Sequence, residues 1–177
     1  SWTSLSEVLL MSLLSLILSV QMFNAPENVQ QQHVDELWTF VQALAGREKP
    51  QPILYFTTEE EPVVTWKFLG FYYEHTNVIR IFPRAWRRDL PQSGGLHGTV
   101  YMAIGHELLH YALFGHIPIE RHHCFFAEKS YELRIAEFVV DREIGHPVLK
   151  TKQKNEDQWK IKECILSGEV EDKAGQR

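Results

Sequence analysis

The chain has 177 residues, which fits one domain, and its 44% hydrophobic and 23% charged residues are typical of a globular protein rather than a disordered one. Its formal net charge of -5 offers no basic surface for the phosphates of DNA or RNA, so we expect no nucleic-acid partner. The two cysteines, Cys124 and Cys164, are too few for a disulfide scaffold. They could form one bridge in an oxidising compartment or stay as free thiols in the cytosol, and the sequence leaves both possibilities open.

An apolar run begins the chain. From Leu5 to Phe23 it contains serines and one charge, Glu7. This length is close to the minimum for a membrane span and also resembles the apolar part of a signal peptide. No Lys or Arg precedes the run, and its serines recur at helical spacing, which is typical of a packed helix. We expect residues 1–25 to form an anchor, a signal, a pro-segment or a packed helix, with membrane association or export preferred to a cytoplasmic location.

Residues 26–150 are expected to form the main domain. Apolar residues at steps of three and four predict an amphipathic helix from Val29 to Leu44. The stretch Pro52–Thr58 is rich in β-forming residues and predicts a strand. Two further runs, "VVTWKFLGFYYE" and "VIRIFP", are separated by a polar turn and predict a β-hairpin.

The second half of the chain is predicted to be helical. One helix is expected from about Leu96 to Phe114 and another from about Ala127 to Ile144, with the loop "GHIPIERHHC" between them. The highly charged tail, residues 151–177, is expected to contain one short helix. Early strands followed by helices predict an α+β fold, with a small antiparallel or mixed sheet packed on a backing helix and on the two later helices.

The stretch "HELLH" carries the strongest chemical signal. On a helix, His106 and His110 lie one turn apart on the same face, so both imidazoles can bind one metal ion. Glu107 follows the first ligand and would lie beside a water on that metal, where a carboxylate can act as general base. The flanking residues are apolar, which indicates an interior helix. A buried His-Glu-His face without a metal would be costly.

A catalytic zinc site of this kind needs a third protein ligand. His116 lies ten residues after His106, but Leu113 stands where a metzincin-type turn requires glycine. An all-histidine site would use His122 or His123. Two glutamates, Glu120 and Glu132, are further candidates without a supporting pattern.

Glu137 is the preferred third ligand. Asp141 follows it one helical turn later and could accept the free ring N–H of a ligating histidine. Both acids could instead be solvated helix charges that pair with Arg134 or Arg142.

"HELLH" followed by "AEFVVDREIG" resembles the gluzincins, zinc peptidases in which a glutamate on a later helix is the third ligand. The step from Glu137 to Asp141 and Arg142 is similar to that of HtpX/Ste24-type peptidases, although Val140 stands where alanine is usual. The spacing between His110 and Glu137 is more similar to the ImmA/IrrE type, which usually has asparagine at the position of Asp141. In size and element order the chain resembles the minigluzincins, and the resemblance implies a zincin-like fold.

The resemblance also implies roles for other residues. An extended substrate would pair with the strand before the active-site helix, here Val78, Arg80 and Phe82. Transition-state charge needs a donor besides the metal, for which Tyr131, His116 and His122 are candidates. We therefore expect a Zn2+-dependent peptidase that acts on peptide or protein substrates. The alternative is a catalytically silent zinc-binding module with a regulatory or structural role.

Overall fold

The computed structural model of the protein describes residues 19–58, 69–86, 100–142, 144 and 158–164. Most of the N-terminal apolar run therefore lies outside the described residues. The end of that run is not helical, because Gln21–Phe23 forms strand β1 of the sheet. Among the described residues, no helix combines the length and the apolar character that a membrane span requires.

A four-stranded mixed sheet forms one layer of the fold, with strand order β1-β2-β4-β3. Strand β2 (Ile53–Phe56) pairs in parallel with β1 and with β4 (Val78–Ile81). Strand β3 (Gly70–Tyr72) pairs antiparallel with β4 and is the last strand on that side among the described residues. The strand and hairpin predicted from the sequence are thus confirmed over the described residues, and the α+β class is confirmed with them.

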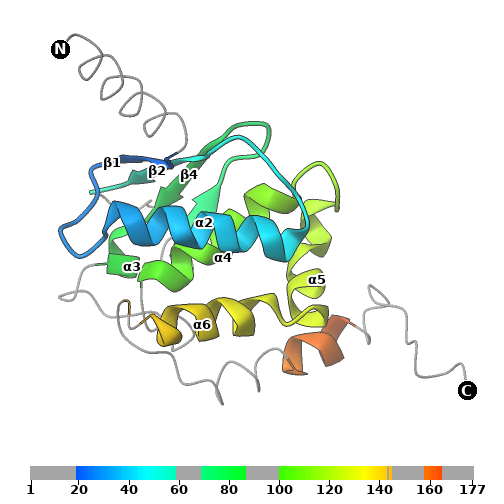
Figure 1. The fold of residues 1–177 in the computed structure, drawn as a ribbon. Helices are drawn as coiled ribbons and strands as arrows, with labels where there is room; N and C mark the ends of the chain where they lie inside the picture. The colour runs from blue at the N-terminus through cyan, green and yellow to red at the C-terminus, as the bar shows by residue number, and fades with distance from the viewer. Residues whose placement is uncertain (1–18, 59–68, 87–99, 143, 145–157, 165–177) are drawn as a thin grey trace, which may run out of the picture.

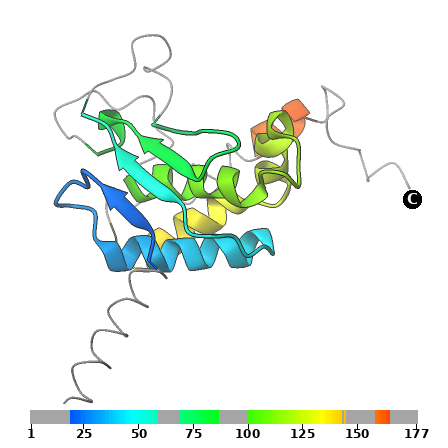
Figure 2. The ribbon, with the colours of Figure 1, turned by 90° about the horizontal axis from the view of Figure 1, so that it is seen from above.

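The helices cover one face of this sheet (Figures 1 and 2). Helices α2 (Gln31–Ala45) and α4 (Val100–Leu113) pack against each other, and α4 also contacts β3 and β4. Helix α6 (Tyr131–Asp141) packs on α4 on the side away from the sheet (Figure 1). The short helix α3 (Pro83–Trp86) follows β4. Alternating strand residues such as Leu54, Phe56, Ile79 and Ile81 are buried, as one covered face requires.

Helix α2 forms where its apolar spacing predicts. Its buried residues follow steps of three and four and are Val34, Leu37, Trp38, Val41 and Leu44. It ends at Gly46, whose left-handed backbone (φ 63°) allows N–H groups to bond the last carbonyls of the helix. This helix is the backing layer for α4.

Helix α4 lies at the centre of the molecule. Every one of its residues is buried except His106, which is partly exposed. Gly105 explains how closely α6 approaches, because a Cβ at this position would lie 2.8 Å from Cγ2 of Ile135. The two helices therefore meet in contact at the turn that carries His106.

The connection between α4 and α6 differs from the predicted loop. It contains a 3-10 turn, Ile119–Arg121, followed by helix α5 (His122–Glu128). The predicted single helix from Ala127 to Ile144 is accordingly broken, with Ser130 in a left-handed conformation between α5 and α6. As a result His122 and His123 lie on the first turn of a helix rather than in a loop.

A short helical segment at residues 158–164 confirms part of the helix predicted in the tail. A disulfide between Cys124 and Cys164 joins it to α5. The open question of the two cysteines is therefore answered in this structure by a bridge. Strand β1 and residues 158–164 come from the two ends of the chain, and both pack with the central domain.

Candidate metal centre

Three histidines bring one ring nitrogen each to the same point. The Nε2 atoms of His106 and His110 lie 3.1 Å apart, and Nε2 of His123 lies 3.1 Å from His110 and 3.2 Å from His106. Helix α4 supplies two of these rings and the first turn of α5 supplies the third. These residues form the group that could hold a metal ion in the described part of the chain.

The separations fit a tetrahedral metal site. Zinc–nitrogen bonds of about 2.0–2.1 Å at tetrahedral angles place two ligand nitrogens roughly 3.3 Å apart. The observed 3.1–3.2 Å is close to this value. Three imidazoles with one remaining position are also a donor set used by catalytic zinc. The residues present therefore fit Zn2+.

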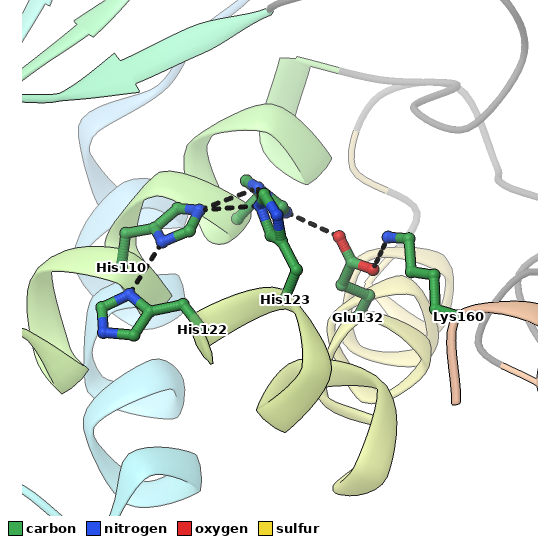
Figure 3. Close-up of polar contacts among 6 residues, drawn as sticks. His110, His122, His123, Glu132 and Lys160 are labelled. Atoms are coloured by element: carbon green, nitrogen blue, oxygen red, sulfur yellow. Dashed lines mark hydrogen bonds and ion pairs between the residues drawn. The ribbon is translucent and has the colours of Figure 1, made fainter. Parts of the chain in front are cut away.

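A carboxylate fixes the orientation of His106. Nδ1 of His106 lies 2.6 Å from Oε1 of Glu132, a residue of α6 that is 1% exposed. Because the carboxylate can only accept, Nδ1 carries the proton and Nε2 of a neutral ring keeps its lone pair for a metal. The other oxygen of Glu132 accepts a 2.7 Å bond from Nζ of Lys160 in the 158–164 segment. Figure 3 shows this pair beside the histidines.

A second histidine fixes His110. Nε2 of His122 lies 2.9 Å from the carbonyl oxygen of Ile117, so it must donate, and Nδ1 of a neutral His122 must accept. That Nδ1 lies 2.9 Å from Nδ1 of His110, which is therefore the protonated nitrogen of His110. The lone pair of His110 is left on Nε2, the atom that lies 3.1 Å from Nε2 of His106 and of His123. Figure 3 shows this atom directed toward His123. Both histidines of α4 are thus held in the tautomer that a metal needs.

The electrostatic environment favours neutral ligands at two of the three positions. Burial and the neighbouring His106 hold the pKa of His110 well below its usual value. His123 is more exposed, but partial loss of solvent around its ring and the neighbouring His106 still lower its pKa to about 4. Burial also lowers the pKa of His106, but the hydrogen bond to Glu132 and the charges of Glu132 and Glu107 outweigh it and raise that pKa. A positive charge is therefore stabilised on the Glu132 side of the cluster.

Glu107 lies in the same pocket and against the edge strand. A Cβ on Gly70 would be 2.7 Å from Cγ of Glu107, so the glycine lets this side chain lie on the backbone of β3. Burial raises the pKa of Glu107 to about 7, while the charge of His106 and a hydrogen bond from the backbone N–H of Tyr72 act in the opposite direction. A carboxylate with a pKa near neutrality can both take and return a proton.

The histidines and Glu107 open into a pocket of about 690 Å³. Strand β3 forms one wall of this pocket through Gly70, Phe71 and Tyr72. The 158–164 segment forms another, with Trp159 and Lys160 among the lining residues. The cluster is therefore reachable by a ligand larger than water.

The structure brings a different third residue to the candidate site. Among the described residues, His123 rather than the predicted Glu137 joins His106 and His110 in the group that could hold a metal ion. Glu137 comes five residues after Glu132 on α6, so it projects about 140° further around that helix, away from the direction of His106. Asp141 is exposed at the end of α6. The Nδ1 atoms of His106 and His110 are hydrogen-bonded to Glu132 and His122, and not to Asp141 as predicted.

The predicted transition-state donors also lie elsewhere. Tyr131 is buried with its ring edge-on to Phe125, and His116 is exposed beside Arg47. His122 is completely buried behind His110, to which its Nδ1 is hydrogen-bonded, and it is therefore not open to a substrate. None of these three residues lines the pocket.

The predicted substrate strand is an interior strand. Strand β4, which holds Val78 and Arg80, pairs with β2 on one side and β3 on the other. Phe82 is buried, and its N–H donates to the carbonyl oxygen of Leu69. The edge beside the site belongs instead to β3.

Comparison of the chain with protein-family models, with curated proteins and with solved structures finds no match. A function for the site is therefore inferred from the geometry and chemistry of its own residues.

Proposed function

We propose that the protein is a zinc-dependent peptidase with a zincin-like fold. His106, His110 and His123 would hold Zn2+, Glu107 would act as general base, and the substrate would be an extended peptide or protein segment. The observation that carries this proposal is the convergence of three Nε2 atoms within 3.2 Å of one another, in one pocket with a buried glutamate whose pKa is about 7.

When bound, Zn2+ would act as a Lewis acid that polarises the scissile carbonyl and acidifies a water molecule. Glu107 would take the proton from the attacking water and pass it to the leaving amine. Its raised pKa suits both steps, because neither the protonated nor the ionised form is strongly disfavoured near pH 7. Glu132 and His122 would keep the metal-facing nitrogens of His106 and His110 unprotonated.

Strand β3 is the best support for an extended substrate. It is a sheet edge, it lines the pocket, and Phe71 on it is 47% exposed. A peptide added to this edge would lie beside Glu107, which already contacts Gly70 and Tyr72. Backbone pairing with side-chain pockets is a common mode of peptide recognition.

The experiment is cleavage of a mixed peptide library by zinc-loaded protein, for wild type and Glu107→Gln. We expect the variant to keep its zinc and to lose activity by at least about 100-fold, because general-base catalysis contributes that much or more. Glu36→Gln, a half-buried glutamate on α2 that does not line the pocket, serves as the control and should remain active. Zinc binding without cleavage in the wild type would instead indicate a catalytically silent zinc-binding module.

A further inference from the structure

The 158–164 segment is a wall of the proposed metal site, and a disulfide attaches it there. Cys164 is bonded to Cys124, and Trp159, Lys160, Glu163 and Cys164 all line the pocket. Cys124 directly follows His123, one of the three converging histidines. The bridge thus joins the helix that carries a candidate ligand to the segment that closes the pocket.

Lys160 completes the surroundings of Glu132. This carboxylate is 1% exposed, and its two oxygens have separate partners: Oε1 binds His106 and Oε2 binds Nζ of Lys160 at 2.7 Å. Without Lys160, a buried carboxylate would lack one donor and be free to turn away from His106.

The segment needs the covalent attachment. Its described part has seven helical residues, and a helical stretch of this length is marginal in water on its own. Its largest side chain, Trp159, is 63% exposed and therefore buries little apolar area. The bridge and the Lys160–Glu132 pair are thus two principal attachments of this segment to α5 and α6.

We propose that the Cys124–Cys164 disulfide is a redox latch for the metal centre, meaning that its reduction lowers the metal affinity of the site. The disulfide keeps Lys160 against Glu132, and Lys160 is a positioning residue that acts on His106 through this carboxylate. This inference rests on the proposed metal site and adds its regulation: the site is complete only under oxidising conditions, where such bridges persist.

The opening reaction is thiol–disulfide exchange with a dithiol reductant. One thiolate of the reductant attacks a sulfur of the bridge, forming a mixed disulfide and releasing one cysteine thiolate. The second thiol of the reductant displaces the other cysteine. Two electrons pass from the reductant, which becomes a cyclic disulfide, and both cysteines end as thiols.

The test is Zn2+ affinity, measured by competition with a chromophoric chelator. Wild type is compared before and after reduction with dithiothreitol, which is removed under nitrogen by gel filtration before the titration. The Cys124→Ser/Cys164→Ser variant repeats the reduced state without thiols that could bind zinc. Lys160→Met removes the charge with the bridge intact, Lys160→Arg restores it, and Lys162→Met is an exposed control on the same segment.

We expect the reduced protein, the double serine variant and Lys160→Met each to bind zinc roughly 10-fold or more weakly, the range typical of lost outer-shell partners. Lys160→Arg should recover most of the affinity, and Lys162→Met should stay within about two-fold of wild type. Combining Lys160→Met with the double serine change should add little, because both remove the same contact.

Wild-type affinity in the reduced and serine proteins would overturn the latch and leave the proposed function standing. Weak binding in the serine variant with normal binding in Lys160→Met would overturn the role of Lys160. A wild type that binds no zinc would overturn the proposed function itself, and the latch with it.

Discussion

Glu132 and His106 are 26 residues apart in the sequence and are joined by a 2.6 Å hydrogen bond where α6 packs on α4. Gly105, which directly precedes His106, lets α4 approach Ile135, one turn after Glu132, and this close approach makes the contact possible. A buried carboxylate bound to a ring nitrogen is the arrangement that orients metal-binding histidines in proteins.

Replacing Glu132 by alanine should therefore weaken zinc binding by roughly 10- to 100-fold. The change leaves Nδ1 of His106 without its acceptor and frees the ring to rotate. Chelator competition measures the effect. Glu128→Ala, an exposed glutamate on α5, is the matched control. Equal affinities for the two variants would refute the orienting role of Glu132.

His122 should affect zinc affinity through its Nδ1 atom, which accepts the hydrogen bond from His110. His122→Phe fills the buried site but leaves Nδ1–H of His110 unpaired, so zinc affinity should fall by roughly 10-fold or more. His122→Asn can present Oδ1 to His110 and should lose less. Long-range ¹H–¹⁵N spectra of metal-free wild type should show His110 protonated at Nδ1. Protonation at Nε2 would contradict the assigned tautomers.

Gly70→Ala should impair catalysis more than metal binding. The new methyl group would lie 2.7 Å from Cγ of Glu107 and 3.0 Å from the carbonyl oxygen of Arg80, so the glutamate must move. Small displacements of catalytic groups can cost about 100-fold in rate. We expect kcat to fall by roughly 10- to 100-fold with zinc affinity within about two-fold of wild type. In a Glu107→Gln background the same change should have little further effect.

The burial of Glu107 predicts a pH dependence of stability in the metal-free protein. Its pKa is raised from 4.5 to about 7, so folding favours the protonated form. The stability that protonated Glu107 contributes to the folded state is fully present below pH 4.5 and is lost as the pH rises toward 7. This loss amounts to roughly 3 kcal/mol in the free energy of unfolding. Glu107→Gln should thus gain stability relative to wild type between pH 4.5 and 7, as urea unfolding would measure. A constant difference over this range would contradict the raised pKa.

Local patterns in the sequence predicted most helices and strands, because apolar residues recur at the spacing of the buried positions in each element. The stripe Val34, Leu37, Trp38, Val41 and Leu44 identified α2, and the β-rich runs identified β2, β3 and β4. Two of the three converging histidines, His106 and His110, followed from helical spacing alone, as did Glu107. The sheet order did not, since the parallel pairing of β2 with β4 joins two strands that β3 separates in the chain.

The third histidine and the outer contacts depend on tertiary packing. His123 was only one of several candidates because the sequence placed it in a loop, whereas in the structure it lies on the first turn of α5. A signal for Glu132 was present, because it shares the buried stripe of α6 with Ile135, Ala136 and Val139, where an unpaired charge would be costly. Glu137 lies off that stripe. Lys160 has no local signal, since a disulfide from a different part of the chain brings it to the site.

The most direct test of the metal centre is elemental analysis of zinc per chain in wild type, His123→Ala and Glu137→Ala. The three-histidine site predicts about one zinc in wild type and in Glu137→Ala, and a clear loss in His123→Ala. Retention of zinc by His123→Ala, with loss from Glu137→Ala, would contradict this site and restore the glutamate as the third ligand.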